Sequence, residues 1–333
     1  MKAVVMTATG GADVLQVQEL PAPTLRSPHD VLIRLHAAGV NPVDTKLRSK
    51  GTYRPEQATH ILGCDGAGVV EAIGSAVTRV QPGDAVWYCY GGIGGPQGNY
   101  AQQAVIDENL LAHKPAALDF ATAAAGPLVL ITAWEALHDR ARLQAGQTVL
   151  IHAGAGGVGH VAIQLAKAAG CTVITTVSSD AKADLVRALG ADHVINYRNG
   201  DFVAQVLQLT GGQGVDIAFD TVGGAIIQQT FAAVRPYGDL VSLLQPDASI
   251  DWKIARLRNL RFSLELMLSP MYYGWSEALR HHGWILEQCS ALADQGRLKI
   301  HVAHALPLVQ AAAAHRLIEA GGMTGKIVLL VDE

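Results

Sequence analysis

The sequence predicts an α/β protein in which a doubly wound parallel sheet is joined to a second, β-rich domain. Strand-like and helix-like segments alternate between residues 147 and 244, as they do in a parallel sheet with helices on both faces. A glycine-rich turn, HAGAGGVG, joins the first of these strands to the first of these helices. The first ~120 residues instead carry short apolar runs between glycines, which is typical of a compact barrel-like β fold.

The individual elements follow from the spacing of apolar residues and from the positions of the glycines. Residues 30–40 alternate as a strand, and shorter strands are expected at 66–74 and 83–92. Helices are expected to end at Gly170, Gly190 and Gly238, where a left-handed cap suits glycine. The central strands are expected at 147–154, 171–177, 192–197, 215–223 and 239–244, with a possible sixth at 261–268, and the helices between them at 158–170, 181–190, 202–212 and 225–238. A helix at 275–296, a short strand, a helix at 311–321 and a strand at 326–331 complete the chain.

Size and charge exclude several kinds of partner. The chain has 333 residues, half of them hydrophobic, so about two domains with large cores are expected. A formal net charge of −4 argues against a nucleic acid bound through a basic face. The start, MKAVVMTATGG, lacks an apolar segment followed by a cleavage site, and the longest uncharged stretch, residues 120–134, is too short to span a bilayer. We therefore expect a soluble, cytoplasmic protein without a membrane partner.

The cysteines fit a reducing compartment. Cys64, Cys89, Cys171 and Cys289 are scattered and form no CxxC pair. We expect them to be free, buried thiols.

The glycine-rich turn predicts a dinucleotide site. It follows a strand and opens a helix, which is the context in which GxGxxG has a mechanism. The first glycine permits the tight turn, the middle ones let the backbone approach a pyrophosphate, and the last allows the helix to pack on the strand. The N-terminus of the helix then offers N–H groups to the anion. The residues expected to bind the dinucleotide in this turn are Gly154, Gly156, Gly157, Val158 and Gly159.

The end of the next strand bears on which dinucleotide is bound. An acidic residue there would select NAD by binding the ribose 2′-hydroxyl. Instead Ser178 and Ser179 follow Val177, which leaves room for a 2′-phosphate, and Lys182 lies one helical turn further on. Asp180 has two interpretations: an N-cap of the helix at 181–190, or a ribose ligand that would favour NAD.

The whole chain resembles the zinc-independent medium-chain dehydrogenases/reductases, and within them the quinone oxidoreductase (ζ-crystallin-like) branch. The resemblance implies a GroES-like β-rich catalytic domain, residues 1–123 with 269–333, wrapped around a Rossmann nucleotide-binding domain, residues 124–268. It also implies an active site in a cleft and a homodimer with the sheets of the nucleotide domains joined. It rests on AAGVNPVDTKLRSKGTY, ILGCDGAGVVEAIGSAV, VQPGDAV, ITAWEAL, HAGAGGVGHVAIQLAKAAG and LGADHVINYR.

The zinc ligands of related dehydrogenases are missing from this chain. Zinc relatives have a cysteine where Asn41 stands, a histidine–glutamate pair at Cys64–Asp65, and a third cysteine near Leu128. Of the four cysteines of their structural zinc lobe, Cys89 alone is present. Tetrahedral zinc needs thiolate, imidazole or carboxylate ligands at set positions, so we expect no metal. An adventitious zinc on Cys64, Asp65 and a nearby histidine is the alternative.

The resemblance implies NADPH as the cofactor and assigns residues to it. Ser178, Lys182 and Tyr197 would surround the 2′-phosphate, and Asn41 and Thr132 would sit by the nicotinamide, at the catalytic centre. Lys326 would reach a phosphate or be a strand-edge lysine. The rest of the cofactor would be lined by Thr221, Val222, Leu243, Leu244 and Gln245.

Tyr53 is the candidate proton donor, because zinc-free enoyl reductases of the superfamily carry a tyrosine at this place. Its alternative role is a wall that stacks on substrate. Asp44 is expected to be buried and to cap the loop rather than to titrate. Cys64 is either a redox-sensitive thiol or a small filler of the substrate cleft. The cleft would also include Asp65, Met267 and Tyr272, the last two from the segment MLSPMYYGW, which has core packing or the dimer interface as alternatives.

The expected reaction is hydride transfer from NADPH to a hydrophobic quinone or α,β-unsaturated carbonyl. Without zinc, alcohol oxidation lacks the Lewis acid that forms an alkoxide, whereas an electron-poor C=C bond or quinone needs less assistance. Two alternatives remain. One is an enoyl-thioester reductase that uses Arg256, Arg258 and Arg261 as a basic patch, and the other is an NADPH-binding, crystallin-like protein with little turnover.

Overall fold

The computed structural model describes residues 1–56 and 60–331, which form two compact units. The first unit comprises Met1–Ile131, Leu268–Gly296 and the chain from Ile300 onward; the second comprises Thr132–Met267 with Arg297–Lys299. No helix of the described residues is both long enough and apolar enough to cross a membrane.

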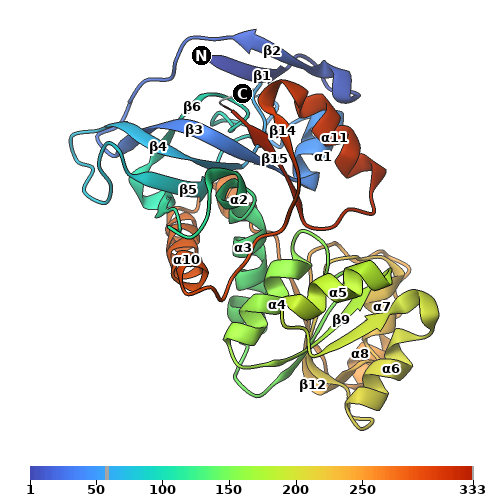
Figure 1. Cartoon of the computed structure of the whole chain (residues 1–333). Helices are drawn as coiled ribbons and strands as arrows, with labels where there is room; N and C mark the ends of the chain where they lie inside the picture. Colours follow the sequence, from blue (N-terminus) through green and yellow to red (C-terminus); the bar gives the residue numbers. More distant parts are fainter. Residues whose placement is uncertain (57–59, 332–333) are drawn as a thin grey trace. The chain divides into compact units, whose positions relative to one another are not determined.

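The first unit is built on a mostly antiparallel sheet with strand order β14-β15-β3-β4-β5-β7, and β6 also pairs with β3 (Figure 1). The strands of this unit are β1 (Lys2–Met6), β2 (Leu15–Glu19), β3 (Asp30–Val40), β4 (Asp65–Ile73), β5 (Ala85–Cys89), β6 (Gln103–Asp107), β7 (Ala112–His113), β14 (Val302–Pro307) and β15 (Lys326–Leu330). Its helices are α1 (Pro42–Lys50), α2 (Phe120–Ala124), α9 (Ser269–Tyr273), α10 (Ser276–Asp294) and α11 (Ala311–Ala320), with single turns at Ala12–Val14, Glu108–Leu110 and Leu308–Gln310.

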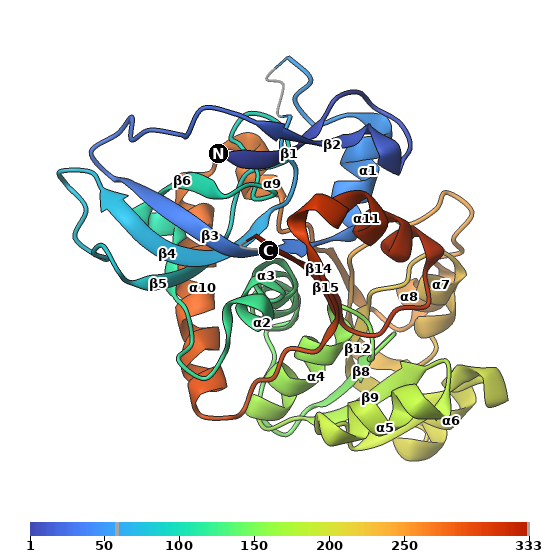
Figure 2. The same ribbon diagram turned by 45° about the horizontal axis from the view of Figure 1, so that its top comes forward.

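The long strand β3 holds this sheet together, as its alternating sequence predicts. Val31, Ile33 and Leu35 are completely buried, because every second side chain of a strand points to the same face. β3 pairs antiparallel with β4, β6 and β15. The predicted strand at 30–40 is therefore confirmed, and its end at Val40 delivers the chain directly into α1. Figure 2 shows α1 beside α11, the helix that leads into β15.

The second unit is a parallel sheet with strand order β10-β9-β8-β11-β12-β13. This confirms the predicted doubly wound architecture, including the sixth strand. The strands are β8 (Thr148–Ile151), β9 (Thr172–Val177), β10 (His193–Asn196), β11 (Val215–Asp220), β12 (Val234–Ser242) and β13 (Arg261–Leu264). The helices are α4 (Gly159–Ala168), α5 (Asp180–Ala188), α6 (Phe202–Leu209), α7 (Ala225–Thr230) and α8 (Lys253–Leu257), with a single turn at Tyr197–Asn199. Helix α3 (Pro127–Trp134) contains the junction of the two units and continues as a π-helical segment, Glu135–Arg140.

The sheet order explains which helices share a face. From β8 the chain moves outward to β9 and β10, and then returns past β8 to β11, β12 and β13. Right-handed crossovers therefore place α4 and α5 on one face and α6, α7 and α8 on the other (Figure 1). The core of the second face contains Phe202 and Val206 of α6, Ile227 of α7 and Ala255 of α8.

Two of the three predicted glycine caps are confirmed. Gly170 and Gly190 follow α4 and α5 with φ of 82° and 100°, which favours glycine. The predicted helix at 225–238 is wrong after Thr230, because Val234–Ser242 form β12 instead. Gly238 lies inside that strand, and a Cβ there would come within 2.6 Å of Val234 Cγ1. The glycine signal at this position therefore reports close packing in the strand rather than the end of a helix.

Candidate active site

Asn41 is placed by the junction between β3 and α1. It is the N-cap of α1 and is followed by Pro42, which suits the first turn of a helix because it lacks an N–H group. The Asn41 N–H donates to Asp44 Oδ2 over 2.8 Å. Asp44 is completely buried, so it has the buried, capping role expected from the sequence.

The carboxamide of Asn41 connects a buried acid to a buried base. Its Nδ2 donates to Asp65 Oδ2 over 2.8 Å, and its Oδ1 accepts from Lys326 Nζ. Lys326 Nζ also donates to Val40 O over 3.3 Å and lies 3.9 Å from Asp65 Oδ2. Asn41, Asp65 and Lys326, called the lysine–aspartate cluster below, are at most 3% exposed. Because both ends of the amide are held, the orientation of Asn41 is fixed.

The sequence left two roles open for Lys326, a phosphate contact or a strand-edge lysine, and the structure excludes the second. β15 lies inside the sheet between β14 and β3, and Lys326 is 3% exposed. Burial lowers the pKa of its ammonium group, and the Asp65 carboxylate opposes that shift. Burial likewise raises the pKa of Asp65, opposed by Lys326 and by hydrogen bonds from Asn41 and Leu128 N.

A glycine permits this close arrangement. Gly39 on β3 pairs with Asp65 on β4. A Cβ at Gly39 would come within 2.4 Å of Ala124 O and 2.9 Å of Asp65 Oδ2, which no real side chain tolerates. The glycine in AAGVN therefore makes room for the Asp65 carboxylate, a role that the sequence analysis did not assign to it.

A second buried set, Asp44, Tyr100 and His315, lies behind the N-cap. Tyr100 Oη donates to Asp44 Oδ2 over 2.9 Å and lies 3.2 Å from His315 Nε2. Burial raises the pKa of Asp44 to about 7 and lowers that of His315 to about 3, so His315 is neutral at physiological pH. Tyr100 and His315 were not among the residues predicted from the sequence. The available signal was a histidine within the run AAAAHRL, on a face of α11 that packs against the core.

The residues of this region do not fit a zinc ion. Within residues 1–56 and 60–331, no group of three histidine, cysteine or acidic side chains is placed to hold a metal. All four cysteines are free and buried, as predicted. A hydrogen bond with Cys89 lowers the pKa of Cys64, but burial and nearby carboxylates outweigh it and raise the pKa overall. The Lys326 ammonium beside Asp65 adds a positive charge where a zinc ion would need anionic ligands.

Tyr53 lies just beyond α1 and is 42% exposed. Its N–H donates to Ile93 O over 2.8 Å, which holds the backbone in place. Burial of its inner part and the neighbouring Cys64 raise the pKa of the phenol, so Tyr53 stays protonated at physiological pH. Its ring meets that of Tyr272 edge-on at 6.0 Å between centroids. Cys64 and Asp65 are completely buried, and Met267, which belongs to the second unit, is 3% exposed.

In the second unit, the glycine-rich turn packs as closely as its sequence suggests. A Cβ at Gly154 would come within 2.0 Å of Thr175 Oγ1, and one at Gly159 within 2.3 Å of Ala153 O. A Cβ at Gly156 would meet Ala153 O at 3.1 Å and no other described atom within 4 Å beyond its chain neighbours, so the turn is less crowded at this glycine. A turn bounded by glycine against β9 and followed by the N-terminus of α4 suits a pyrophosphate.

The residues expected near a 2′-phosphate gather at the carboxyl ends of β9 and β10. Val177 pairs with Asn196, which brings Ser178 and Tyr197 to neighbouring strand ends. The N-cap of α5 is Ser179, whose Oγ accepts from Lys182 N over 3.4 Å. The N-cap interpretation of Asp180 is therefore wrong: it is the first residue of the helix, and its Oδ1 accepts from Asn196 Nδ2 over 3.3 Å.

Asp220 shapes the next two loops at this edge of the sheet. This buried carboxylate accepts from Val222 N over 3.0 Å and from Ser242 Oγ over 2.7 Å, so it ties the loop after β11 to the end of β12. Thr221 Oγ1 donates to His152 O over 2.9 Å. Sequence reasoning missed Asp220, although an acid at the end of the apolar strand VDIAFD was a usable signal. Leu243 and Leu244 are half-buried, Gln245 is exposed, and Thr132, the first residue of this unit, is 5% exposed.

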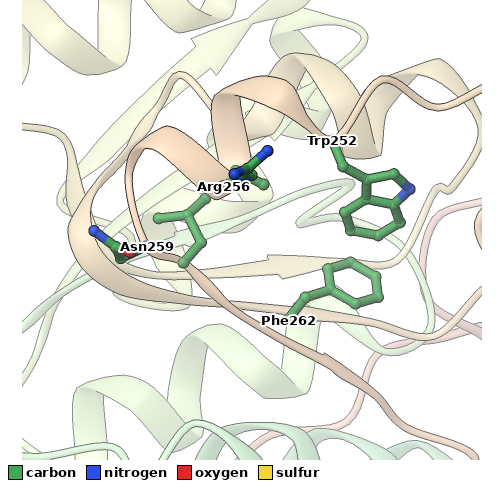
Figure 3. Close-up of a pocket in the computed structure, with 6 residues that line it drawn as sticks. Trp252, Arg256, Asn259 and Phe262 are labelled. Carbon is green, nitrogen blue, oxygen red and sulfur yellow. The ribbon is translucent and has the colours of Figure 1, made fainter.

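Two of the three arginines of the basic patch considered for a thioester substrate are held by local contacts. Arg258 Nη1 donates to Val234 O over 2.7 Å, and Arg261 forms a two-point ion pair with Asp239. Arg256 lines a cavity of about 340 Å³ with Trp252, Ala255, Asn259, Leu260 and Phe262. Figure 3 shows the rings of Trp252 and Phe262 together at one side of this cavity, with Asn259 at the other. None of the residues assigned to the cofactor lines it.

Comparisons with known proteins agree with this arrangement. Residues 27–116 match the family model of the alcohol dehydrogenase GroES-like domain, and residues 189–329 match that of a zinc-binding dehydrogenase. A quinone oxidoreductase of Pseudomonas aeruginosa is 35% identical over 329 residues, 99% of both chains. A 2-haloacrylate reductase of a Burkholderia species is 33% identical over 98% of both chains. The solved structure of an alcohol dehydrogenase superfamily protein from Novosphingobium aromaticivorans is 36% identical over 99% of both chains, with a TM-score of 0.91.

Proposed function

Because the chain belongs to the quinone oxidoreductase branch of the medium-chain dehydrogenase/reductase superfamily, we propose that it is an NADPH-dependent, zinc-independent reductase of quinones or α,β-unsaturated carbonyls. The observation that carries this proposal is the lysine–aspartate cluster. Asn41 and Asp65 of this cluster stand where zinc relatives carry ligands, and together with Lys326 they form an oriented amide and a buried ion pair instead.

The residues of each unit have separate tasks in this proposal. The turn at Gly154–Gly159 binds the pyrophosphate, and Ser178, Lys182 and Tyr197 bind the 2′-phosphate. Asn41 and Thr132 position the nicotinamide. The contact between Asp180 and Asn196 supports NADPH, because it gives this acid a partner other than a ribose hydroxyl.

The reaction transfers two electrons and two protons in total. The reduced nicotinamide, when bound, supplies a hydride to the electron-poor carbon or quinone. Tyr53 supplies a proton to the oxygen or carbon that becomes negative, and solvent reprotonates the phenolate. Its raised pKa keeps the phenol protonated before the reaction begins and makes it a weak acid, so it donates only once the acceptor atom has become negative.

The proposal is tested by the rate of NADPH and NADH oxidation with an ortho-quinone and with a short alkenal, each with and without a chelator. We expect turnover that prefers NADPH and is insensitive to the chelator. Turnover that disappears with chelator would overturn the zinc-independent assignment. Tight NADPH binding without turnover would favour the thioester or non-catalytic alternatives.

We also propose a homodimer through the edge strand β13. This strand ends the sheet of the second unit, and Leu257, Leu264 and Leu266 near it are more than half exposed. An unpaired edge with exposed apolar side chains favours pairing with another chain. Light scattering on the wild type and on Leu264→Lys tests this: the wild type should be dimeric, and the variant should dissociate more readily on dilution.

A further inference from the structure

Two sets of buried residues hold Asn41 by different atoms. The lysine–aspartate cluster holds its carboxamide, whereas its backbone N–H donates to Asp44 Oδ2 over 2.8 Å. Asp44 belongs to the second buried set, Asp44, Tyr100 and His315, which is called the buried triad below. All three residues are completely buried. The proposed reaction gives the side chains of this triad no task.

The hydrogen bonds of the buried triad run in one direction. Tyr100 Oη donates to Asp44 Oδ2 over 2.9 Å, so its oxygen accepts from His315 Nε2, 3.2 Å away. Burial and the neighbouring Arg48 lower the pKa of His315 to about 3. The imidazole is therefore neutral and carries its one proton on Nε2. The donors lead from His315 through Tyr100 to Asp44 Oδ2, the oxygen that also accepts from Asn41.

The two ends of this series have no other partner to replace a lost contact. Within residues 1–56 and 60–331, neither Asp44 Oδ1 nor His315 Nδ1 has a hydrogen-bond partner. The hydrogen bonds that orient the Asp44 carboxyl therefore come from the Asn41 N–H and the Tyr100 hydroxyl. In a buried series of this kind, each hydrogen bond strengthens the next, so the removal of one member weakens the contact with Asn41.

An ion pair joins the same two helices one turn further along. Arg48 Nη2 lies 2.5 Å from Glu319 Oε1. Arg48 follows Asp44 by four residues on α1, and Glu319 follows His315 by four residues on α11, so each pair shares a helix face. Figure 2 shows the two helices side by side. The triad and the ion pair thus join α1 to α11 at successive turns, the triad at the turn that Asn41 begins.

We propose that Tyr100 and His315 are positioning residues for Asn41, an inference that rests on the proposed function. Tyr100 holds the Asp44 carboxylate against the Asn41 N–H, and His315 orients the Tyr100 hydroxyl. The triad fixes the backbone of Asn41 and the lysine–aspartate cluster fixes its carboxamide, so that the amide meets the nicotinamide in one orientation. A small displacement of such a group slows the reaction strongly, because the reacting atoms must be aligned.

The first measurement follows the Asn41 N–H by NMR in cofactor-free protein labelled with 15N-asparagine. The signal is identified by its loss in Asn41→Gln. Burial raises the pKa of Asp44 to about 7, opposed by hydrogen bonds from Asn41 and Tyr100, so we expect the signal to move with pH with that midpoint. Tyr100→Phe removes one of these hydrogen bonds and should raise the midpoint by about one unit.

The other groups that face Asp44 stay the same in this comparison. Asp65 of β4 raises the pKa of Asp44, and Lys326 of β15 lowers it. The neutral His315 and the protonated thiol of Cys64 add no charge. An Asn41 signal that does not respond between about pH 5 and 9, or a midpoint unchanged in Tyr100→Phe, would overturn the proposal. The wild-type titration needs no variant, so it decides even if Tyr100→Phe does not fold.

The second measurement separates positioning from cofactor binding. Tyr100→Phe and His315→Leu should each lower kcat at pH 7 about tenfold and change the NADPH dissociation constant less than about twofold. Because Asn41 is held best by an ionised Asp44, kcat should fall as the pH drops through the pKa of Asp44, and in Tyr100→Phe it should fall at a higher pH. His315→Gln keeps an N–H donor and should largely retain both kcat and the pH profile.

Glu319→Gln is the matched control. It breaks the ion pair between α1 and α11 and leaves the buried triad intact, so it should lower the urea midpoint but leave kcat and the Asn41 titration unchanged. If Glu319→Gln lowers kcat as much as Tyr100→Phe, or if the triad variants change the urea midpoint alone, the triad only joins the helices and the proposal is wrong. A wild type that oxidises no NADPH would overturn the proposed function, while the NMR titration still tests the triad.

Discussion

Replacing Lys326 by methionine tests whether the lysine–aspartate cluster is an ion pair on which the first unit depends. Methionine keeps most of the length of the side chain and removes its charge. Asp65 would then be completely buried without a cation, retaining hydrogen bonds from Asn41 Nδ2 and Leu128 N. Breaking a buried pair on one side is costly because the remaining charge has no compensation.

The size of the effect follows from the proton that Asp65 must take up. Protonating a carboxyl with a reference pKa of about 3.9 costs about 4 kcal/mol at pH 7 and about 1.5 kcal/mol at pH 5, at about 1.4 kcal/mol per unit. We therefore expect Lys326→Met to lower the free energy of unfolding by about 3–4 kcal/mol at pH 7 and by less than half of that at pH 5. The double variant Asp65→Asn/Lys326→Met removes both charges and should recover most of the loss.

Urea unfolding at both pH values, followed by circular dichroism, measures these differences. Wild type, both single variants and the double variant complete a cycle from which the coupling energy is obtained. A loss below about 1 kcal/mol at pH 7, or an equal loss at pH 5, would show that the cluster is not held as an ion pair.

Three further predictions concern the cofactor, the proton donor and a buried acid. Lys182→Ala should raise the NADPH KM about tenfold, the value of one charge-assisted contact, and leave the NADH KM unchanged; equal effects on both cofactors would refute the 2′-phosphate assignment. Tyr53→Phe should lower enone turnover at least about tenfold, about 1.4 kcal/mol of barrier, whereas unchanged turnover would identify Tyr53 as a wall. Burial and the neighbouring Glu135 raise the pKa of Glu265 to about 8, so the folded chain holds a proton that the unfolded chain releases. The free energy of unfolding should therefore fall between about pH 5 and pH 8, by up to about 1.4 kcal/mol per unit, and a Glu265→Gln variant with the same slope would contradict this.

The sequence predicted the architecture of the second unit well because its signals are local. Each strand is a short apolar run, and Gly170 and Gly190 mark the helix ends by their own backbone conformation. Gly238 led to a wrong helix end because glycine is also required where backbone segments approach closely. A Cβ added at this position would meet Val234. The same composition signal thus has two physical causes, which the sequence alone does not separate.

The candidate site was harder to predict from the sequence because the residues that contact one another there are far apart in the chain. Asn41 and Lys326 are 285 positions apart, and no periodicity connects them. Lys326 therefore fitted a phosphate contact or a strand edge, while its environment is set by Asp65 and by the position of β15 inside the sheet. Ser179 and Asp180 are adjacent, and both residue types are common N-caps. Which of them caps α5 depends on their backbone angles, which the residue types do not determine.

The position of Lys326 near the end of the chain also determines when the first unit can be completed during synthesis. Asn41 and Asp65 leave the ribosome long before the lysine that neutralises them, since 285 residues at about 5–20 per second take roughly 15 s to a minute. During that interval β3 lacks its partner strand β15, and Asp65 lacks the cation that neutralises it. The second unit, almost continuous in sequence from Thr132 to Met267, is complete earlier. The first unit, which contains the lysine–aspartate cluster and Tyr53, therefore completes its folding last.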